Sequence, residues 1–209
     1  MNLINTECSV SRAMQPSTEA IEKAFTEGPV ISMDGYNYFV SPLSDGIPSV
    51  TKQLLDEIAD NVVALCKLDC DMLLAPEAMG IPIASAVTMR TGIPYSVIRK
   101  RQYLLPGEIT LFQATGYSKA HMYINGVNKG DRVVIVDDVV STGGTLKATV
   151  KALKDHGITV TEICVIFDKC ADIRTLSEEI GVPIRAILKV AVVDGRPTVL
   201  RRLNPVGSV

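Results

Sequence analysis

The sequence predicts an α/β protein with a doubly wound, mainly parallel β-sheet flanked by helices. Short apolar runs of strand character alternate along the chain with segments that have helical periodicity, which is typical of such sheets. One run, Arg132–Val136 (RVVIV), is apolar throughout, as expected for a strand buried on both faces. A length of 209 residues suits one domain. We expect a loose tail over residues 1–16 and a single domain over residues 17–209.

In the first half of the chain, helices and strands alternate with short connections. A Gly-Pro pair at positions 28–29 ends the first predicted helix, and the second predicted helix has apolar residues on one face. A proline at the start of the third predicted helix is tolerated in a first turn. The expected elements are a helix over Ser17–Glu27, a strand over Tyr36–Val40, a helix over Val50–Lys67, a strand over Met72–Ala75 and a helix over Pro82–Thr91.

The second half continues the alternation around one long polar segment. Arg99–Asn128 contains three glycines and Pro106, and it is too long for an ordinary connection, so we expect a functional flap or a hairpin. The remaining expected elements are strands over Pro94–Ile98, Arg132–Val136, Val160–Phe167 and Ile184–Val193, and helices over Thr145–His156 and Asp172–Ile180.

Composition excludes several classes of protein. Twenty-one Lys and Arg against 23 Asp and Glu give a net charge of −2, so the basic surface typical of nucleic-acid binding is missing. Glu77 interrupts the longest apolar stretch, Met72–Val87, so no membrane span is expected. The amino terminus lacks the apolar core of a signal peptide, and we expect a cytoplasmic protein.

The five cysteines and two histidines do not form a metal or redox motif. None of the cysteines makes a C-x-x-C pair, and His121 and His156 lie far apart in the sequence. We therefore expect buried or incidental thiols.

The segment Val133–Thr145 (VVIVDDVVSTGGT) carries the strongest functional signal. A buried strand ends in two acids, Asp137 and Asp138, and a turn rich in hydroxyl groups and glycine then opens a helix. Backbone N–H groups at a helix start bind phosphate, and glycine permits close approach. Carboxylates at a strand end can accept hydrogen bonds from a sugar diol or hold hydrated magnesium. The predicted phosphate-binding residues are Ser141, Thr142, Gly143, Gly144 and Thr145.

The alternative is purely structural. Ser141 or Thr142 would cap the helix, as such residues commonly do, and the two aspartates would be solvated loop residues. The acid pair and the turn together favour a ligand site for ribose 5-phosphate.

The segment VVIVDDVVSTGGT is similar to the phosphoribosyl-pyrophosphate-binding motif of type I phosphoribosyltransferases, and the resemblance extends from Gly28 to about Val193. LLAPEAMGIPIA resembles the family's pyrophosphate loop. VIRKRQYLLPGE with GYSKAHMYI resembles the flap of adenine phosphoribosyltransferases, and YFVSPLSDGIP resembles their amino-terminal hood. The whole pattern is most similar to adenine-enzyme-like purine transferases of archaea, often assigned to hypoxanthine and guanine. It implies a hood at about residues 28–48 and a flexible flap at about residues 101–118.

The resemblance also implies a reaction and its site residues. Phosphoribosyl pyrophosphate (PRPP) would give its ribose 5-phosphate to a purine base, with Mg2+ as cofactor. Asp137 and Asp138 would hold the ribose hydroxyls and, directly or through water, Mg2+. The residues implied for pyrophosphate are Glu77, Ala78, Met79, Gly80, Arg99, Lys100 and Arg101. In several members of the family the basic run reaches across a homodimer interface, although a charge run is also typical of a solvated strand end.

The purine contacts and the proton acceptor are less defined. Tyr36, Tyr38 and Phe39 could stack on a purine, although aromatic strands usually fill a core. Lys169 could donate to the O6 atom of hypoxanthine or guanine, and it could equally be solvated. The proton acceptors of two related enzyme groups do not carry over, because Ser141 and Gly116 occupy their positions. Glu108 is the remaining flap carboxylate, and an exposed loop acid is an equal alternative.

Other functions stay open at this point. The alternatives are an adenine phosphoribosyltransferase, an orotate or pyrimidine transferase, and a non-catalytic regulator that binds PRPP. Regulators of this kind carry a DNA-binding segment, and the first residues up to about Pro29 show no helix-turn-helix pattern. The expected partners are PRPP, a purine and a second copy of the chain, with no nucleic acid or membrane.

Overall fold

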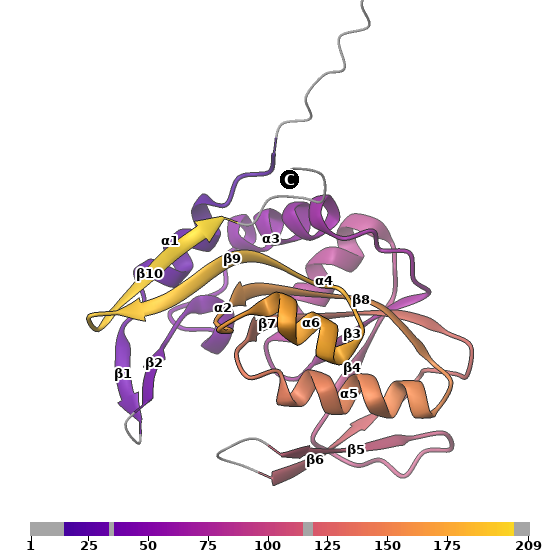
Figure 1. Cartoon of the computed structure of the whole chain (residues 1–209). Helices are drawn as coiled ribbons and strands as arrows, with labels where there is room; N and C mark the ends of the chain where they lie inside the picture. The colour runs from indigo at the N-terminus through magenta and orange to yellow at the C-terminus, as the bar shows by residue number, and fades with distance from the viewer. Residues whose placement is uncertain (1–14, 34–35, 115–118, 203–209) are drawn as a thin grey trace, which may run out of the picture.

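The computed structural model describes residues 15–33, 36–114 and 119–202. Within these ranges an eight-stranded sheet runs through the molecule in the order β10-β9-β8-β7-β3-β4-β6-β5 (Figure 1). Strands β9, β8, β7, β3 and β4 are parallel, and β10, β6 and β5 pair antiparallel with their neighbours. The strands are β3 (Met72–Pro76), β4 (Tyr95–Arg99), β5 (Ile109–Ala114), β6 (Lys119–Ile124), β7 (Arg132–Val140), β8 (Thr159–Asp168), β9 (Ile184–Val193) and β10 (Arg196–Arg202). The predicted fold class is confirmed.

Helices cover both faces of the sheet (Figure 1). Helices α1 (Glu19–Thr26), α3 (Lys52–Leu65) and α4 (Gly80–Thr91) share one hydrophobic core, and α5 (Gly144–Asp155) and α6 (Ile173–Ile180) share a second. Successive side chains of a strand enter opposite cores, because side chains alternate across a sheet. In β7, for example, Val134 belongs to the first core and Ile135 to the second. No helix in the described ranges has the length and apolar character to cross a membrane.

Strand β7 is longer than the sequence predicted. It runs to Val140, and its pairing with β8 continues as far as Val140 opposite Asp168. The predicted end of the strand at Val136 is therefore wrong, whereas the acids do lie toward its carboxyl end, as expected. The two valines after the acids favour extended backbone, and the neighbouring strand β8 provides a partner for it. Asp137 and Asp138 consequently lie within the last part of the strand.

The long polar segment contains a hairpin. Strands β5 and β6 pair with each other, and β6 joins the main sheet beside β4. Ile109 and Leu111 of β5 are buried in the second core. The hairpin alternative is confirmed, and this part of the predicted flap belongs to the sheet. Gly116 and its neighbours at positions 115–118 lie outside the described residues.

Three short elements were not predicted. Strand β1 (Val30–Met33) pairs with β2 (Tyr36–Phe39) in a separate two-stranded sheet within the predicted hood, and α2 (Pro42–Asp45) follows. Strand β10 forms a hairpin with β9 through Asp194 and Gly195, both with positive φ. An Asp-Gly pair between strands is a strong hairpin signal, so β10 was detectable despite its basic side chains.

Candidate active site

Two strand-to-helix turns lie next to each other at the carboxyl edge of the parallel strands. One leads from β3 to α4 and the other from β7 to α5. At Gly80, the first residue of α4, a Cβ atom would lie 2.9 Å from the carbonyl oxygen of Val136, which directly precedes Asp137. Glycine is required for this approach. The fold therefore places the predicted pyrophosphate loop beside the predicted ribose-binding acids.

The turn after β7 has the features of an anion site. Gly143 is the N-cap of α5, with a left-handed φ of 73°, and no side chain caps the helix. The first N–H groups of α5 are thus left for another acceptor, such as a phosphate. A hollow of about 180 Å³ is lined by Asp137, Val139, Val140 and residues 141–146. The alternative of a cap by Ser141 or Thr142 is wrong, because both residues precede the N-cap and are exposed.

Helix α6 fixes the shape of this turn. A Cβ atom on Gly143 would lie 2.4 Å from Leu176 Cδ1, so a larger residue would displace the Leu176 side chain, and the positive φ favours glycine there. Leu176 is buried in the second core. The turn is therefore held by packing from behind while its hydroxyl residues remain exposed.

The acid pair lies between the turn that starts α5 and helix α2. Asp137 lines the hollow and accepts a hydrogen bond from the N–H of Asp138 at 3.0 Å. Burial raises the pKa of Asp137 well above its usual value, and the neighbouring charge of Asp138 raises it further. Burial also raises the pKa of Asp138, an effect that the hydroxyl of Ser44 in α2 partly opposes. Two such carboxyl groups favour a ligand that supplies hydroxyl donors or positive charge.

The predicted pyrophosphate loop is tied to the basic run by Glu77. Its Oε1 accepts a hydrogen bond from the N–H of Lys100 at 2.8 Å, and its Oε2 lies 3.5 Å from Arg99 Nη1. The peptide bond between Glu77 and Ala78 is cis. Arg101 instead lies over the Tyr103 ring, and its guanidinium carbon is 5.6 Å from the centre of that ring. Arg99 and Lys100 therefore lie against the loop within one chain.

The aromatic residues of the hood differ in their surroundings. Phe39 is 3% exposed and packs edge-to-face against Phe25 at 4.7 Å, so it is a core residue and is not available to stack on a purine. Tyr38 is half-buried and donates its hydroxyl hydrogen bond to Asp45 Oδ1 at 2.7 Å. The side chain of Tyr36 lies outside the described residues.

Lys169 directly follows β8 and belongs to the same edge of the sheet. Its backbone N–H donates to the carbonyl of Val140 at 2.8 Å, and its Nζ lies 5.0 Å from the centre of the Phe39 ring. It also lines a hollow of about 460 Å³ together with Ser141 and Thr142. Lys169 therefore lies between Phe39 of β2 and the end of β7.

Glu108 has a structural role in its own loop. Its carboxylate accepts hydrogen bonds from the N–H groups of Tyr103 and Leu104 and from Asn125 Nδ2, at 2.9, 3.2 and 2.9 Å. The Asn125 contact is the main reason that the pKa of Glu108 is lowered. A carboxylate held in this way is a weak proton acceptor, so the geometry does not favour Glu108 as a general base.

Sequence reasoning missed a buried ion pair at this edge. Asp168, the last residue of β8, is 1% exposed, and its Oδ2 lies 3.2 Å from Lys189 Nζ on β9. A signal was present, because Asp168 ends the apolar run Ile163–Phe167 and Lys189 interrupts the apolar run from Ala186 to Val193. Ser44, which approaches Asp138, was also missed, since it lies in a turn-rich segment with no distinguishing pattern.

The described cysteines are free thiols that are buried or half-buried. Cys66, Cys164 and Cys170 are buried, and Cys70 is half-buried. A hydrogen bond with Cys164 and burial raise the pKa of Cys66, and burial raises the pKa of Cys70 to about 11 and that of Cys170 to about 12. The thiols of Cys66, Cys70 and Cys170 therefore stay protonated at neutral pH. Cys8 lies outside the described residues.

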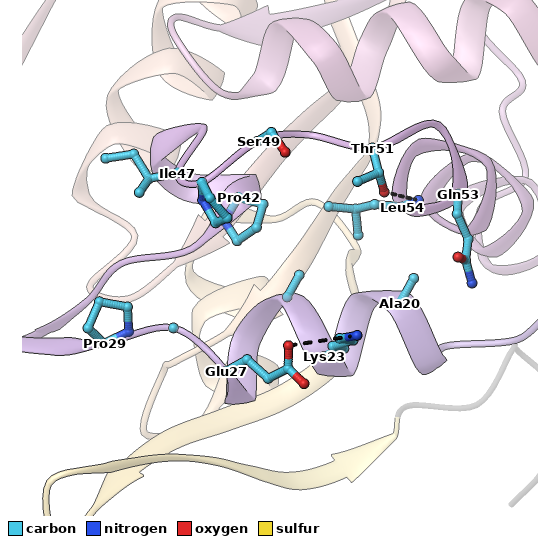
Figure 2. Close-up of a pocket in the computed structure, with 13 residues that line it drawn as sticks. Ala20, Lys23, Glu27, Pro29, Pro42, Ile47, Ser49, Thr51, Gln53 and Leu54 are labelled. Atoms are coloured by element: carbon cyan, nitrogen blue, oxygen red, sulfur yellow. Dashed lines mark hydrogen bonds and ion pairs between the residues drawn. The ribbon is translucent and has the colours of Figure 1, made fainter.

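A separate cavity of about 360 Å³ opens between α1 and the loop that leads from α2 to α3 (Figure 2). Its lining is largely apolar, with Pro29, Pro42 and Ile47 along one side. At its rim Lys23 Nζ lies 3.9 Å from Glu27 Oε2. None of the predicted donor-binding residues lines this cavity.

Comparison with known proteins agrees with this geometry. The family described as "Phosphoribosyl transferase domain" matches residues 49–180. The hypoxanthine/guanine phosphoribosyltransferase of Methanosarcina acetivorans is 47% identical over 174 residues, which are 83% of this chain and 92% of the relative. The hypoxanthine/guanine phosphoribosyltransferase of Methanohalophilus mahii is 43% identical over 182 residues, which are 87% of this chain and 95% of the relative.

Solved structures show the same fold. Adenine phosphoribosyltransferase from Thermoanaerobacter pseudethanolicus superposes with a TM-score of 0.66 at 23% identity, covering 83% of this chain and 99% of that one. The adenine enzyme from Trypanosoma brucei, in complex with AMP, pyrophosphate and ribose 5-phosphate, gives a TM-score of 0.64 at 19% identity over 82% and 78% of the two chains. At these identities the likeness concerns the fold alone. The family match and the close relatives show that this chain belongs to the phosphoribosyltransferase family.

Proposed function

We propose that this protein is a purine salvage enzyme that transfers ribose 5-phosphate from PRPP to hypoxanthine or guanine. The observation that carries the proposal is the side-by-side placement of an uncapped phosphate turn, the acid pair and the Glu77–Gly80 loop at one sheet edge. A phosphate site, a diol site and a second anion site in this order match the parts of PRPP. The hypoxanthine/guanine names of the relatives support the choice of base.

In the proposed reaction, the chain positions both ends of the donor. The Ser141–Thr145 turn binds the 5-phosphate, and Asp137 and Asp138 accept hydrogen bonds from the ribose hydroxyls. The backbone of the Glu77–Gly80 loop, with Arg99 and Lys100 beside it, stabilises the departing pyrophosphate. The C1′–O bond breaks with oxocarbenium character and a purine nitrogen attacks C1′, so charge stabilisation of the leaving group is the main catalytic task.

The residues present fit a magnesium ion that is shared with the substrate. In the described parts of the chain, no group of three or more His, Cys, Asp or Glu side chains could hold a metal ion. The buried acid pair can supply part of an oxygen coordination shell, and PRPP oxygens and water can complete it. Bound there, Mg2+ would neutralise charge on the pyrophosphate.

For the purine, the proposal assigns Lys169 as the donor to the O6 atom. A cationic donor suits the O6 acceptor of hypoxanthine and guanine, and it cannot pair with the amino group of adenine. Leaving a buried polar group unpaired can reduce kcat/KM by up to ~10⁴-fold, so one residue can determine the choice. Adenine remains the second candidate base. No residue is assigned as the general base.

The direct experiment supplies PRPP and Mg2+ with hypoxanthine, guanine or adenine in separate reactions. Formation of IMP or GMP with release of pyrophosphate is the expected result. Lys169→Ala should reduce the ratio of kcat/KM for hypoxanthine or guanine to kcat/KM for adenine. Adenine preferred by tenfold or more would overturn the choice of base. PRPP binding without turnover of any base would instead identify a non-catalytic regulator.

The homodimer and the cytoplasmic location remain predictions. Arg99 and Lys100 lie against the loop of their own chain, yet the family precedent has the basic run acting across an interface. Mixing an Asp137/Asp138 variant with an Arg99/Lys100 variant should restore some activity if Arg99 and Lys100 act on the site of the neighbouring subunit. A monomer in sedimentation that is fully active at nanomolar concentration would exclude this arrangement.

A further inference from the structure

The buried ion pair between Asp168 and Lys189 binds the loop that carries Lys169. Asp168 Oδ1 accepts a hydrogen bond from the N–H of Cys170 at 2.7 Å, while Lys189 Nζ donates to the carbonyl of the same residue. Asp168 Oδ2 lies 3.2 Å from Lys189 Nζ and completes the contact. The backbone N–H and the carbonyl of Cys170, the residue after Lys169, are thus both hydrogen-bonded to this ion pair.

The adjoining backbone of Lys169 is fixed as well. Its N–H donates to Val140 at the end of β7, at 2.8 Å. Just beyond Cys170, Asp172 caps α6 through a hydrogen bond from the N–H of Arg174 at 2.9 Å. Lys169 therefore lies in a short loop that is attached to β7, to the ion pair and to a helix start.

Strand pairing alone does not account for this ion pair. The backbone ladder between β8 and β9 already reaches Asp168 opposite Lys189. A buried ion pair carries a large desolvation cost, and well-packed apolar residues of similar volume often stabilise a fold equally well. What the charged pair provides, and apolar residues cannot, is a donor and an acceptor for the Cys170 backbone.

We propose that Asp168 and Lys189 are positioning residues that hold the Lys169 loop in place and thereby set the affinity and selectivity for the purine. The inference rests on the proposed function, in which Lys169 contacts the base. The pair acts through Lys169, and neither Asp168 nor Lys189 lines the hollow at the phosphate turn, although Asp168 pairs through its backbone with Val140 of that lining. Its loss should therefore influence the purine far more than PRPP.

The same two strands contain a matched control. Glu162 on β8 is 4% exposed, its Oε1 accepts a hydrogen bond from Arg185 Nε on β9 at 2.9 Å, and its Oε2 accepts one from the N–H of Lys67. This second pair also joins β8 to β9 and also binds a backbone N–H. It lies nearer the amino ends of the strands, away from Lys169, so its loss should affect stability without affecting the purine.

The experiment compares Asp168→Leu/Lys189→Met with Glu162→Leu/Arg185→Met, using kcat and KM for hypoxanthine, guanine, adenine and PRPP. In the first variant the KM for the preferred purine should rise about 10-fold or more, because a displacement of about 1 Å has large kinetic effects. The KM for PRPP should stay within about 2-fold, and selectivity over adenine should fall. The control variant should keep all these values. Asp168→Asn, which retains an acceptor for the Cys170 N–H, should rescue most of the purine affinity.

A double-mutant cycle with Lys169→Ala tests whether the pair acts through that residue. In the Lys169→Ala background, removing the pair should change the purine KM by less than about 2-fold. If the double variant does not fold, Lys189→Gln tests the same point, since it removes the cation and retains a polar partner for Asp168. Equal effects on the purine and PRPP, or full effects in the Lys169→Ala background, would overturn the inference. Absence of transfer to any purine by the unmodified protein would overturn the proposed function instead.

Discussion

The two helices that start at the proposed donor site, α4 and α5, differ from α3 and α6 in whether a side chain caps the helix start. Thr51 caps α3 by accepting a hydrogen bond from the N–H of Leu54 at 3.2 Å, and Asp172 caps α6 in the same way. Helices α4 and α5 begin at Gly80 and Gly144 without any side-chain cap. In α3 and α6 a side chain accepts a hydrogen bond from a first-turn N–H group, whereas no side chain does so in α4 or α5, although the Ile81 N–H of α4 donates to the carbonyl of Ala78.

Lack of a cap is not sufficient by itself. Helix α1, whose N-cap is Thr18, also has no side-chain cap, and it lies away from the acid pair. What distinguishes α4 and α5 is that both start at the carboxyl edge of parallel strands, where ligands bind in such sheets. The contact of Gly80 with the carbonyl of Val136 brings their starts together around Asp137.

The largest effect is expected from removing the charges between the two uncapped starts. Asp137→Asn combined with Asp138→Asn should lower kcat/KM for PRPP by about 10³-fold, because the ribose and its metal complex lose their partners. Circular dichroism should show a retained fold, since the substitutions keep the side-chain volume. Steady-state kinetics with the donor varied is the measurement. Unchanged kcat/KM would show that the acids are not part of the site.

The second effect concerns the backbone of the phosphate turn. Gly143→Val should abolish binding of ribose 5-phosphate in calorimetric titration, because valine strains the left-handed backbone and distorts the turn against Leu176.

Gly181→Val is the matched control for that substitution. Gly181 follows α6 with the same φ of 73°, and nothing lies within 4 Å of a Cβ atom there. This variant should lose roughly 1–3 kcal/mol of stability through backbone strain and keep its ribose 5-phosphate affinity. Equal affinity in both variants would mean that the turn does not bind phosphate.

A smaller effect on the KM for PRPP is expected from the exposed hydroxyl groups of Ser141 and Thr142, which should behave differently from Thr51, the side-chain cap of α3. Ser141→Ala with Thr142→Ala should raise the KM for PRPP several-fold and leave the melting temperature unchanged, since neither side chain caps α5. Thr51→Ala should do the opposite, lowering the free energy of unfolding by about 1 kcal/mol with no change in KM. Thermal melts and kinetics with PRPP varied, measured on both variants, check that the two substitutions have opposite effects. A destabilised Ser141/Thr142 variant with normal KM would contradict it.

The smallest effect is a gain in stability. Because burial raises the pKa of Asp137, the folded protein binds that proton more tightly than the unfolded chain does, and stability falls as pH rises from the unfolded pKa through the folded pKa. Asp137→Asn cannot titrate, so its melting temperature should exceed that of the unmodified protein at pH 8, with the difference shrinking toward pH 4. A constant difference in melting temperature across this pH range would show that ionisation of the buried Asp137 does not destabilise the folded protein.

Local sequence patterns were sufficient for the fold and for the position of the glycine turn that starts α5. The alternation of apolar runs and amphipathic helices determines the parallel sheet, and Ser141–Thr145 has the composition of an anion-binding turn whatever its surroundings. The end of β7 was mispredicted, because an acid pair is typical of a loop when its partner strand is unknown. Only the pairing with β8 as far as Asp168 reveals that the strand continues.

Contacts between distant segments were not predictable in the same way. Nothing local indicates that Phe39 packs with Phe25 in the core, or that Glu108 binds Asn125. The pairing of Asp168 with Lys189 likewise depends on the register of two strands. The sequence can nominate such residues by type, but only the tertiary structure decides which of them face a ligand.

The central claim is that the uncapped starts of α4 and α5 form the donor site, and backbone amide chemical shifts test it most directly. Titration of the 15N-labelled protein with PRPP and Mg2+ should shift the amide resonances of residues 77–80 and 141–145 strongly. The amides of the capped first turns, at residues 52–54 and 173–175, should move little. Comparable shifts at both kinds of helix start, or shifts confined to the capped ones, would contradict the account.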